Sequence, residues 1–308
     1  MQNFFDFCFD REFPESVGTL LNLQKSAISY LFSDPRLQLV KLNEEEYSES
    51  QIVYRSRDNE KEAILKAILQ TINPKLLSQD SVRILSIGCG QGIFEKPFLQ
   101  NIIERDKAIH FVGIEPKKKE GKKIQEWCNI ISFERPRQFS FEIHSVGFEE
   151  FESDRSFDII LFINSLYYFS ELKPSIQKSY QLINKGGIAI ATISPKRKLL
   201  NEPYYYVNQR LYGQSRWFSE ALENALIESK ISFIQEKIEF FVNITECFQK
   251  GSQSGKQLLD FMIGANTAYF SPLQLRLLLD YLASGSHKMD TGEVMLPHSV
   301  DLFYFEKE

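Results

Sequence analysis

The chain has 308 residues, of which 43% are hydrophobic and 25% are charged. A globular protein of about this size buries some three quarters of its unfolded surface, so its core needs no metal or disulfide. The 36 Lys and Arg against 41 Asp and Glu give a net charge of −5, which argues against a protein whose main role is binding nucleic acid.

The four cysteines, Cys8, Cys89, Cys128 and Cys247, are widely spaced and form no ligand pattern. This spacing indicates neither a disulfide framework nor a zinc site, and it favours a reducing compartment. The start of the chain lacks the basic and apolar segments of a secretory signal, and no run of about 18 apolar residues occurs. We therefore expect a cytoplasmic protein without a membrane segment.

The first 50 residues show no regular pattern, and we interpret residues 1–50 as an N-terminal extension to a main domain over 51–308. From Asp58 the apolar residues recur at helical spacing as far as Ile72, which predicts an amphipathic helix ending before Pro74. A short apolar run, 83–87, then leads into glycines and is typical of a buried strand.

Helical and strand patterns alternate beyond this point. The expected elements are helices over 94–105, 119–129 and 175–183 and strands over 110–115, 139–145, 157–163 and 188–194. Such alternation predicts an α/β fold with a mostly parallel sheet and helices on both faces.

The last third of the chain mixes further helices with extended segments. We expect helices over 219–230, 256–263 and 272–283, an extended run over 233–244 and a final strand over 300–305. Insertions around 195–218 and 245–298 are interpreted as a substrate lid.

Three glycines follow the first strand in the spacing G-x-G-x-G, at Gly88, Gly90 and Gly92. A third glycine at 93 would complete a dinucleotide fingerprint, but Ile93 stands there. Glycines at this place let the backbone turn sharply and approach a ligand closely. Glu115 ends the next strand, where a carboxylate can accept hydrogen bonds from a ribose diol. The alternative is a turn whose glycines serve chain geometry alone, with a solvated Glu115.

This order of motifs resembles the class I S-adenosylmethionine-dependent methyltransferases. The resemblance covers the glycine turn 84–92, Glu115, the segment 157–166 and the glycines at 186–187. It implies a Rossmann-like sheet of seven strands and S-adenosyl-L-methionine as the cofactor. The cofactor contacts that it implies are Gly88, Gly90, Gly92, Glu115, Glu120, Phe148 and Ile163.

Within that class, the chain most resembles the histamine N-methyltransferase family. The shared strings are short: Leu166-Tyr167-Tyr168, 245–248, 259–261 and the final strand. The resemblance implies a small-molecule substrate held by Asp58 or Glu60, Asn164, Tyr167, Tyr168, Phe261 and His298. Of these, Glu60, Asn164 and His298 are the expected catalytic residues.

The types of these residues favour a nitrogen acceptor. An anionic Glu60 or Asp58 beside aromatic rings suits a cationic amine or an imidazole, and His298 can take up a proton near neutral pH. The direct transfer of a methyl group requires alignment of the reactants but no metal and no covalent nucleophile. The alternatives are O-methylation with His298 as the base, and a cofactor-binding protein without activity. We expect a monomer that binds neither nucleic acid nor membranes.

Overall fold

The computed structural model describes residues 28–72, 79–196, 199–213 and 217–308. Cys8 and most of the expected N-terminal extension lie outside these residues. The chain divides into two compact units. Unit 1 takes in the described residues within 1–60, 196–216 and 239–299, and unit 2 those within 61–195, 217–238 and 300–308.

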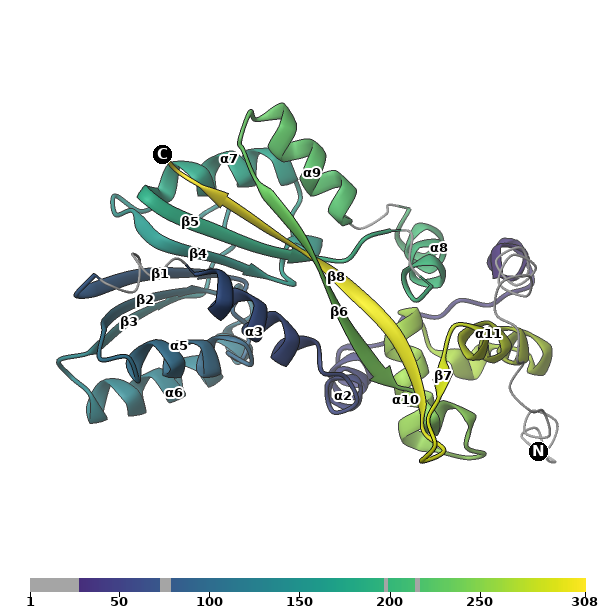
Figure 1. The fold of residues 1–308 in the computed structure, drawn as a ribbon. Helices are drawn as coiled ribbons and strands as arrows, with labels where there is room; N and C mark the ends of the chain where they lie inside the picture. The colour runs from purple at the N-terminus through teal and green to yellow at the C-terminus, as the bar shows by residue number, and fades with distance from the viewer. Residues whose placement is uncertain (1–27, 73–78, 197–198, 214–216) are drawn as a thin grey trace. The chain divides into compact units, whose positions relative to one another are not determined.

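A twisted sheet with the strand order β3-β2-β1-β4-β5-β8-β6 runs through unit 2 (Figure 1). The strands are β1 (Ser81–Ile87), β2 (Ala108–Ile114), β3 (Phe139–His144), β4 (Phe157–Ile163), β5 (Ile183–Ile193), β6 (Ile234–Asn243), β7 (His287–Lys288) and β8 (Val294–Glu306). The strand β7, the end of β6 and the start of β8 fall within the residues of unit 1. The first five strands pair with one another in parallel, whereas β8 is antiparallel to β5. This confirms the predicted α/β, Rossmann-like fold.

The eighth strand was not expected. It is β7, which consists of two residues paired with β8 and is too short to leave a sequence pattern. The strand β8 also begins at Val294, earlier than the predicted 300, and therefore contains His298.

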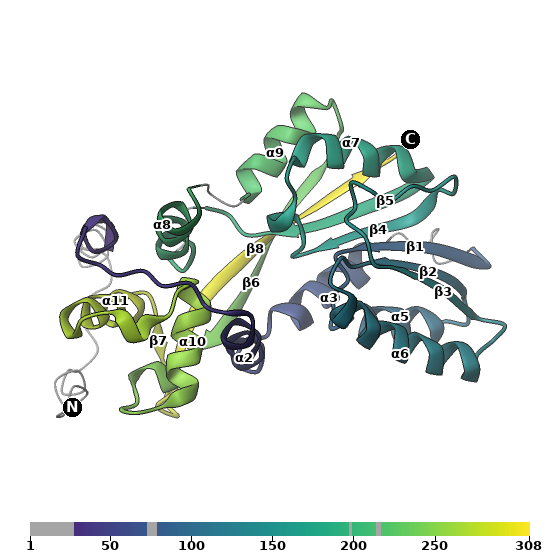
Figure 2. The same ribbon diagram turned by 180° about the vertical axis from the view of Figure 1, so that it is seen from behind.

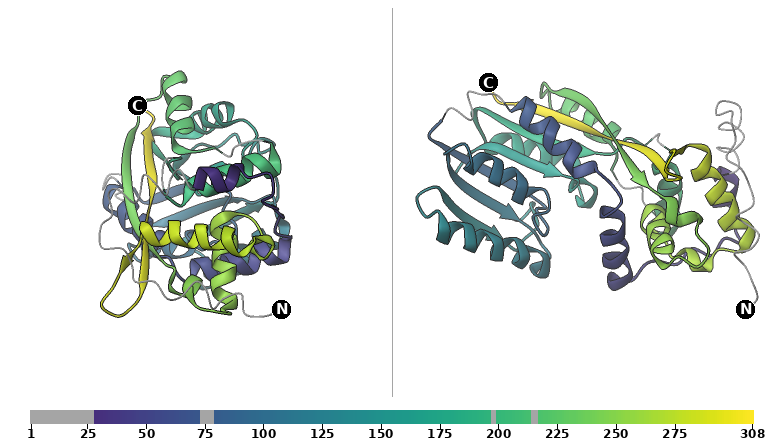
Figure 3. Two further views of the ribbon diagram at one scale, coloured as in Figure 1. Left: turned by 90° about the vertical axis from the view of Figure 1, so that its right-hand side faces the viewer. Right: turned by 60° about the horizontal axis from the view of Figure 1, so that its bottom comes forward.

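Helices cover both faces of the sheet, as predicted. The helices α5 (Glu95–Ile103) and α6 (Lys118–Glu134) lie on one face, and α7 (Leu172–Leu182) and α9 (Ser219–Glu228) lie on the other (Figures 2 and 3). Every residue of β4 is buried, which explains why it consists almost entirely of apolar residues. One core fills the space between the sheet and the helices α7 and α9, where Phe162, Ile176 and Leu226 are fully buried.

The predicted amphipathic helix is α3 (Glu60–Thr71). Ile64 and Ile68 on its apolar face are fully buried and Ile72, just past its end, nearly so. The side chain of Thr71 is 3.1 Å from the hydroxyl of Tyr304, so the end of α3 is bonded to β8 within unit 2.

Unit 1 contains α2 (Glu44–Arg55), α8 (Asn201–Tyr212), α10 (Gln253–Ile263) and α11 (Pro272–Ser284). Although residues 1–50 show no regular sequence pattern, α2 begins within them, at Glu44. This helix has few apolar residues, so its periodicity is weak. Its sequence signal is a capping box, in which Asn43 and Glu46 each bond the other's backbone N–H.

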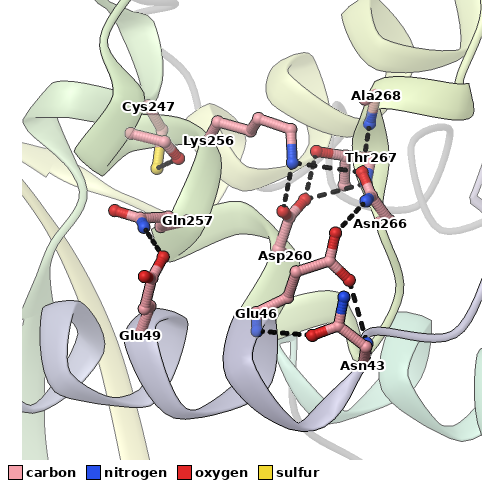
Figure 4. Close-up of polar contacts among 11 residues, drawn as sticks. Asn43, Glu46, Glu49, Cys247, Lys256, Gln257, Asp260, Asn266, Thr267 and Ala268 are labelled. Atoms are coloured by element: carbon pink, nitrogen blue, oxygen red, sulfur yellow. Dashed lines mark hydrogen bonds and ion pairs between the residues drawn. The ribbon is translucent and has the colours of Figure 1, made fainter.

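A buried carboxylate links several segments of unit 1 (Figure 4). Asp260 of α10 accepts hydrogen bonds from the backbone N–H and hydroxyl of Thr267, at 2.8 and 2.6 Å, and from the ammonium group of Lys256. Asn266 accepts from the same ammonium and donates to Glu46 of α2, each at 3.1 Å. This network fixes the turn after α10 and connects it to α2.

None of the helices in the described parts of the chain is long and apolar enough to cross a membrane.

Candidate functional site

The candidate site lies in unit 2, at the edge of the sheet where the parallel strands end. The glycine turn follows β1, Glu115 follows β2, and Asn164 with Ser165 follows β4. Because β2, β1 and β4 are neighbours in this order, the three segments lie next to one another. In open parallel sheets, ligands bind in the crevice beyond these strand ends.

The three glycines of the turn all have left-handed backbone angles. The φ angles of Gly88, Gly90 and Gly92 are 73°, 54° and 76°, a region that costs other residues about 1–2 kcal/mol each. A Cβ at Gly88 would lie 2.5 Å from the Cβ of Ser165, whereas a Cβ at Gly90 would meet no heavy atom within 4 Å. Gly88 is therefore needed for a close approach to the β4 end, and the backbone at Gly90 has open space beside it.

Glu115 fixes the far side of the turn. One of its carboxylate oxygens accepts a hydrogen bond from the backbone N–H of Gly90 at 3.0 Å, and the other accepts from that of Lys117 at 2.9 Å. The residue is 8% exposed. Each carboxylate oxygen has a second lone pair, so the group can accept further hydrogen bonds from a diol.

A second buried carboxylate supports the turn from within the unit. Glu95, at the start of α5, accepts a hydrogen bond from the Ser86 hydroxyl at 2.8 Å, and both residues are buried. Burial raises the pKa of the Cys89 thiol well above its ordinary value, and the charges of Glu95 and Glu115 add to this effect. Cys89 is therefore a packed thiol within the turn and not a reactive thiolate. No sequence motif pointed to a role for Ser86 or Glu95.

The segment after β4 is held by β5. Asn164 has a left-handed φ of 55°, its backbone N–H donates to the hydroxyl of Thr192 at 2.9 Å, and that hydroxyl donates to the Asn164 side-chain oxygen at 2.9 Å. The side chain of Asn164, a predicted substrate contact, is thus bonded through its oxygen to a fully buried threonine. The next residue, Ser165, is 6% exposed, and its hydroxyl makes no hydrogen bond.

The two predicted tyrosines of this segment differ in exposure. The hydroxyl of Tyr167 accepts a hydrogen bond from the backbone N–H of Ser194 at 2.7 Å, which connects it to the end of β5. Tyr168 is 64% exposed.

The remaining predicted cofactor contacts are distributed around the same edge. Ile163 ends β4 and is buried. Phe148 is also buried, with its ring edge-on to Phe162, so its side chain belongs to the core. Glu120 lies in the first turn of α6, with its carboxylate 3.4 Å from the ammonium of Lys123.

Two carboxylates predicted to bind substrate, Asp58 and Glu60, belong to unit 1. The Asp58 carboxylate accepts a hydrogen bond from the backbone N–H of Glu60 at 2.8 Å, and its backbone forms a bridge with Val242. The neighbouring Asn59 accepts from the N–H of Phe241 at 2.9 Å. These bonds fix the start of α3 against the end of β6 and leave Glu60 9% exposed.

Phe261 and His298 also lie in unit 1. The ring of Phe261 packs against those of Tyr54 and Tyr47, with centroids 4.7 and 5.6 Å away. The ring of His298 is buried edge-on to that of Phe240, with centroids 5.0 Å apart. The predicted cofactor contacts thus lie in unit 2, as do the predicted substrate contacts Asn164, Tyr167 and Tyr168. The other predicted substrate contacts, Asp58, Glu60, Phe261 and His298, lie in unit 1.

The residues at the strand ends fit the expected cofactor. Open space beside Gly90, a carboxylate with free lone pairs at Glu115 and an unpartnered hydroxyl at Ser165 are features that a polar ligand would satisfy. No group of three or more His, Cys, Asp or Glu suited to a metal ion occurs among the residues that the structure describes.

Comparison with known proteins decides the family. A family model for the methyltransferase domain matches residues 54–229, which is more than half of the chain. The chain belongs to the methyltransferase family. This confirms the predicted enzyme class and, with it, the predicted cofactor, S-adenosyl-L-methionine. No curated protein matches this methyltransferase in sequence.

Solved structures agree with the fold. The YcgJ protein from Bacillus subtilis is similar with a TM-score of 0.51 at 14% identity, over 79% of this chain and 98% of that one. A proposed methyltransferase from Bacillus halodurans has a TM-score of 0.50 at 14% identity and the same coverage. A proposed histamine N-methyltransferase from Thermotoga maritima has a TM-score of 0.48 at 14% identity, over 86% of this chain and 96% of that one. The first two similarities support the fold of the methyltransferase and say nothing of its substrate.

Proposed function

We propose that this methyltransferase transfers a methyl group from S-adenosylmethionine to a nitrogen of a small imidazole- or amine-containing molecule. The choice of a nitrogen acceptor rests on Glu60, which is nearly buried in unit 1. The same unit contains a cluster of three aromatic rings, those of Phe261, Tyr54 and Tyr47. A carboxylate and aromatic faces together favour a cation.

The cofactor contacts in this proposal are the glycine turn, Glu115 and the buried Ile163, with Glu120 and Phe148 as peripheral positions. Glu115 would accept hydrogen bonds from the ribose diol while it holds the N–H of Gly90. The bound cofactor supplies an electrophilic methyl group. The protein's residues align the acceptor and exclude water.

On the substrate side, Glu60 would pair with the cationic group of the acceptor molecule, and Phe261 of the same unit would contribute an aromatic face. The substrate contacts of Tyr167 and Tyr168 in unit 2 stay predictions. A second, neutral nitrogen of that molecule forms the new N–C bond as the S–C bond of the cofactor breaks, and S-adenosylhomocysteine leaves. The product then releases a proton, from the methylated nitrogen if the acceptor is an amine or from the other ring nitrogen if it is an imidazole. His298 is the proposed acceptor of that proton, because an imidazole exchanges protons readily near neutral pH. Asn164 orients the segment that follows β4 through its hydrogen bonds with Thr192.

Replacement of the ribose-binding carboxylate should weaken cofactor binding. We expect Glu115→Ala to reduce the affinity for S-adenosylhomocysteine by about 1–3 kcal/mol, since a hydrogen bond to a charged group is lost. Calorimetric titration measures this difference. The matched control is Glu126→Ala, because Glu126 is an exposed carboxylate on α6 whose nearest cation, Lys122, is 4.0 Å away. Equal affinity in Glu115→Ala and wild type would rule out this contact.

The substrate assignment is tested by assaying transfer of a radiolabelled methyl group to a panel of imidazoles, amines, phenols and thiols. We expect an imidazole or amine product, and a roughly tenfold lower kcat/KM for Glu60→Gln with cofactor affinity unchanged. Product methylated on oxygen, with activity lost in His298→Ala, would instead identify an O-methyltransferase. Cofactor binding without turnover across the panel would favour a non-catalytic protein.

A further inference from the structure

The helix α6, which covers part of one face of the sheet in unit 2, carries two large apolar side chains on its outer side (Figure 1). Ile130 is 57% exposed and Phe133 is 88% exposed. The opposite side of the helix packs on the sheet, where Ile124 and Cys128 are fully buried. Ile130 and Phe133 are three residues apart and are therefore neighbours on the helix surface, outside the core.

Two lysines continue the same surface toward the start of α6. Lys119 and Lys122 lie in line with Ile130 and Phe133, because steps of three and four residues keep to one side of a helix. Glu126 lies between the two pairs, and its carboxylate is 4.0 Å from the ammonium of Lys122. We call these five residues the α6 stripe.

The charge around the α6 stripe is opposite in sign to that of the whole chain. The segment 117–137 contains seven Lys and Arg against three Glu, a net charge of +4, whereas the chain carries −5. All seven basic residues are exposed. Such a segment attracts an anionic surface, and the attraction acts within about 10 Å at about 0.1 M salt.

The combination of lysines with exposed apolar side chains favours a lipid surface over other anionic partners. Lysine and glutamate are depleted in protein–protein interfaces, whereas lysines beside phenylalanine or leucine are typical of helices that lie on membranes. A nucleic acid would bind the lysines through its phosphates but would leave Ile130 and Phe133 in water.

We propose that the outer side of α6 is a docking surface for an anionic lipid bilayer. The lysines contact the anionic headgroups, and Phe133 with Ile130 enters the boundary between headgroups and acyl chains. The expectation from sequence that the protein does not bind membranes rested on the lack of a signal segment and of a long apolar run. Docking on the surface of a bilayer requires neither of these.

Cosedimentation of the full-length protein with lipid vesicles tests this proposal. One set of vesicles contains phosphatidylcholine alone, and the other an equal mixture of phosphatidylcholine and phosphatidylserine. We expect wild type to sediment with the mixed vesicles only, and less of it as the salt concentration is raised. The assay needs no cofactor or acceptor, so its result is independent of the proposed function.

Two substitutions separate the apolar contribution from the electrostatic one. Phe133→Ser should weaken binding to the mixed vesicles by about tenfold, because the apolar ring no longer leaves water. Lys122→Gln should weaken it by about fivefold, the effect of one basic residue near an anionic surface. Since both side chains are exposed, both variants should melt at the temperature of wild type.

Two exposed residues elsewhere in unit 2 provide the matched controls. Ile227 lies on α9, on the other face of the sheet, and Lys185 lies in β5. Ile227→Ser and Lys185→Gln should bind the mixed vesicles as wild type does. Losses equal to those of the α6 variants would overturn the proposal, because they would show that α6 is not the binding surface.

Two results with wild type alone would also overturn it. Equal sedimentation with both sets of vesicles would show that anionic lipid is not recognised. Binding to neither set would exclude the bilayer as the partner, and retention of an RNA oligonucleotide in that case would assign the lysines to nucleic acid instead.

Discussion

Gly88→Ala is expected to weaken cofactor binding by about a hundredfold, since backbone strain and overpacking at the turn each cost about 1–3 kcal/mol. Two causes act together. A left-handed φ of 73° costs alanine about 1–2 kcal/mol. Its methyl group would also lie 2.5 Å from the Cβ of Ser165, so the turn or the β4 end must move. Titration with S-adenosylhomocysteine measures the loss.

Gly186→Ala is the matched control for this substitution. Gly186 has nearly the same φ, 75°, and a Cβ there would meet no heavy atom within 4 Å. The substitution Gly186→Ala therefore introduces the backbone strain without a steric overlap of the new methyl group, at a position outside the proposed cofactor contacts. Gly186→Ala should lose stability but keep cofactor affinity. Similar affinities for Gly88→Ala and Gly186→Ala would show that the close approach to Ser165 is unimportant.

Asp260→Ala is expected to lower the free energy of unfolding by about 3 kcal/mol, because it removes the partner of several buried donors. Asp260 is 2% exposed and accepts from the N–H and hydroxyl of Thr267 and from Lys256. The side chain of Lys256 is 34% exposed, so water can satisfy part of what it loses. Urea-induced unfolding measures the difference.

Asp280→Ala is the control for Asp260→Ala. Asp280 forms the same i,i+4 arrangement with Arg276 on α11, but at 3.8 Å and with its own side chain 50% exposed. Exposed ion pairs contribute about 0–1 kcal/mol, so this variant should unfold almost as wild type does. Equal losses for the two variants would mean that the Asp260 network has no special role in unit 1.

Local patterns were sufficient to predict most of unit 2. The apolar run of β1, its glycine turn and Glu115 follow one another within a short stretch of sequence, and each leaves a separate signal. The edge of the sheet that holds the candidate site follows from the same pattern, because parallel strands end on one side. Unit 1 was harder to predict from sequence, since α2 is polar. This helix is stabilised by its capping box and by a hydrogen bond from the distant Asn266.

The hydrogen-bond partners of individual side chains could not be predicted from local sequence patterns, for a physical reason. Asn164 is a predicted substrate contact, and its side-chain oxygen accepts from Thr192, a partner 28 residues away that no local pattern reveals. Ser165 stood in a recognised motif without a role, because a missing hydrogen bond is visible only once all neighbours are placed. The Ser86–Glu95 pair likewise requires the turn to be folded before the two side chains meet.

The central claim is that the methyl donor binds at the ends of β1, β2 and β4. Hydrogen exchange of the wild-type protein, with and without saturating S-adenosylhomocysteine, tests it most directly. We predict slower exchange of the backbone N–H groups of the turn 88–92 and of 115–117, with no change in α9. Binding of the ligand without protection of these two segments would contradict the account.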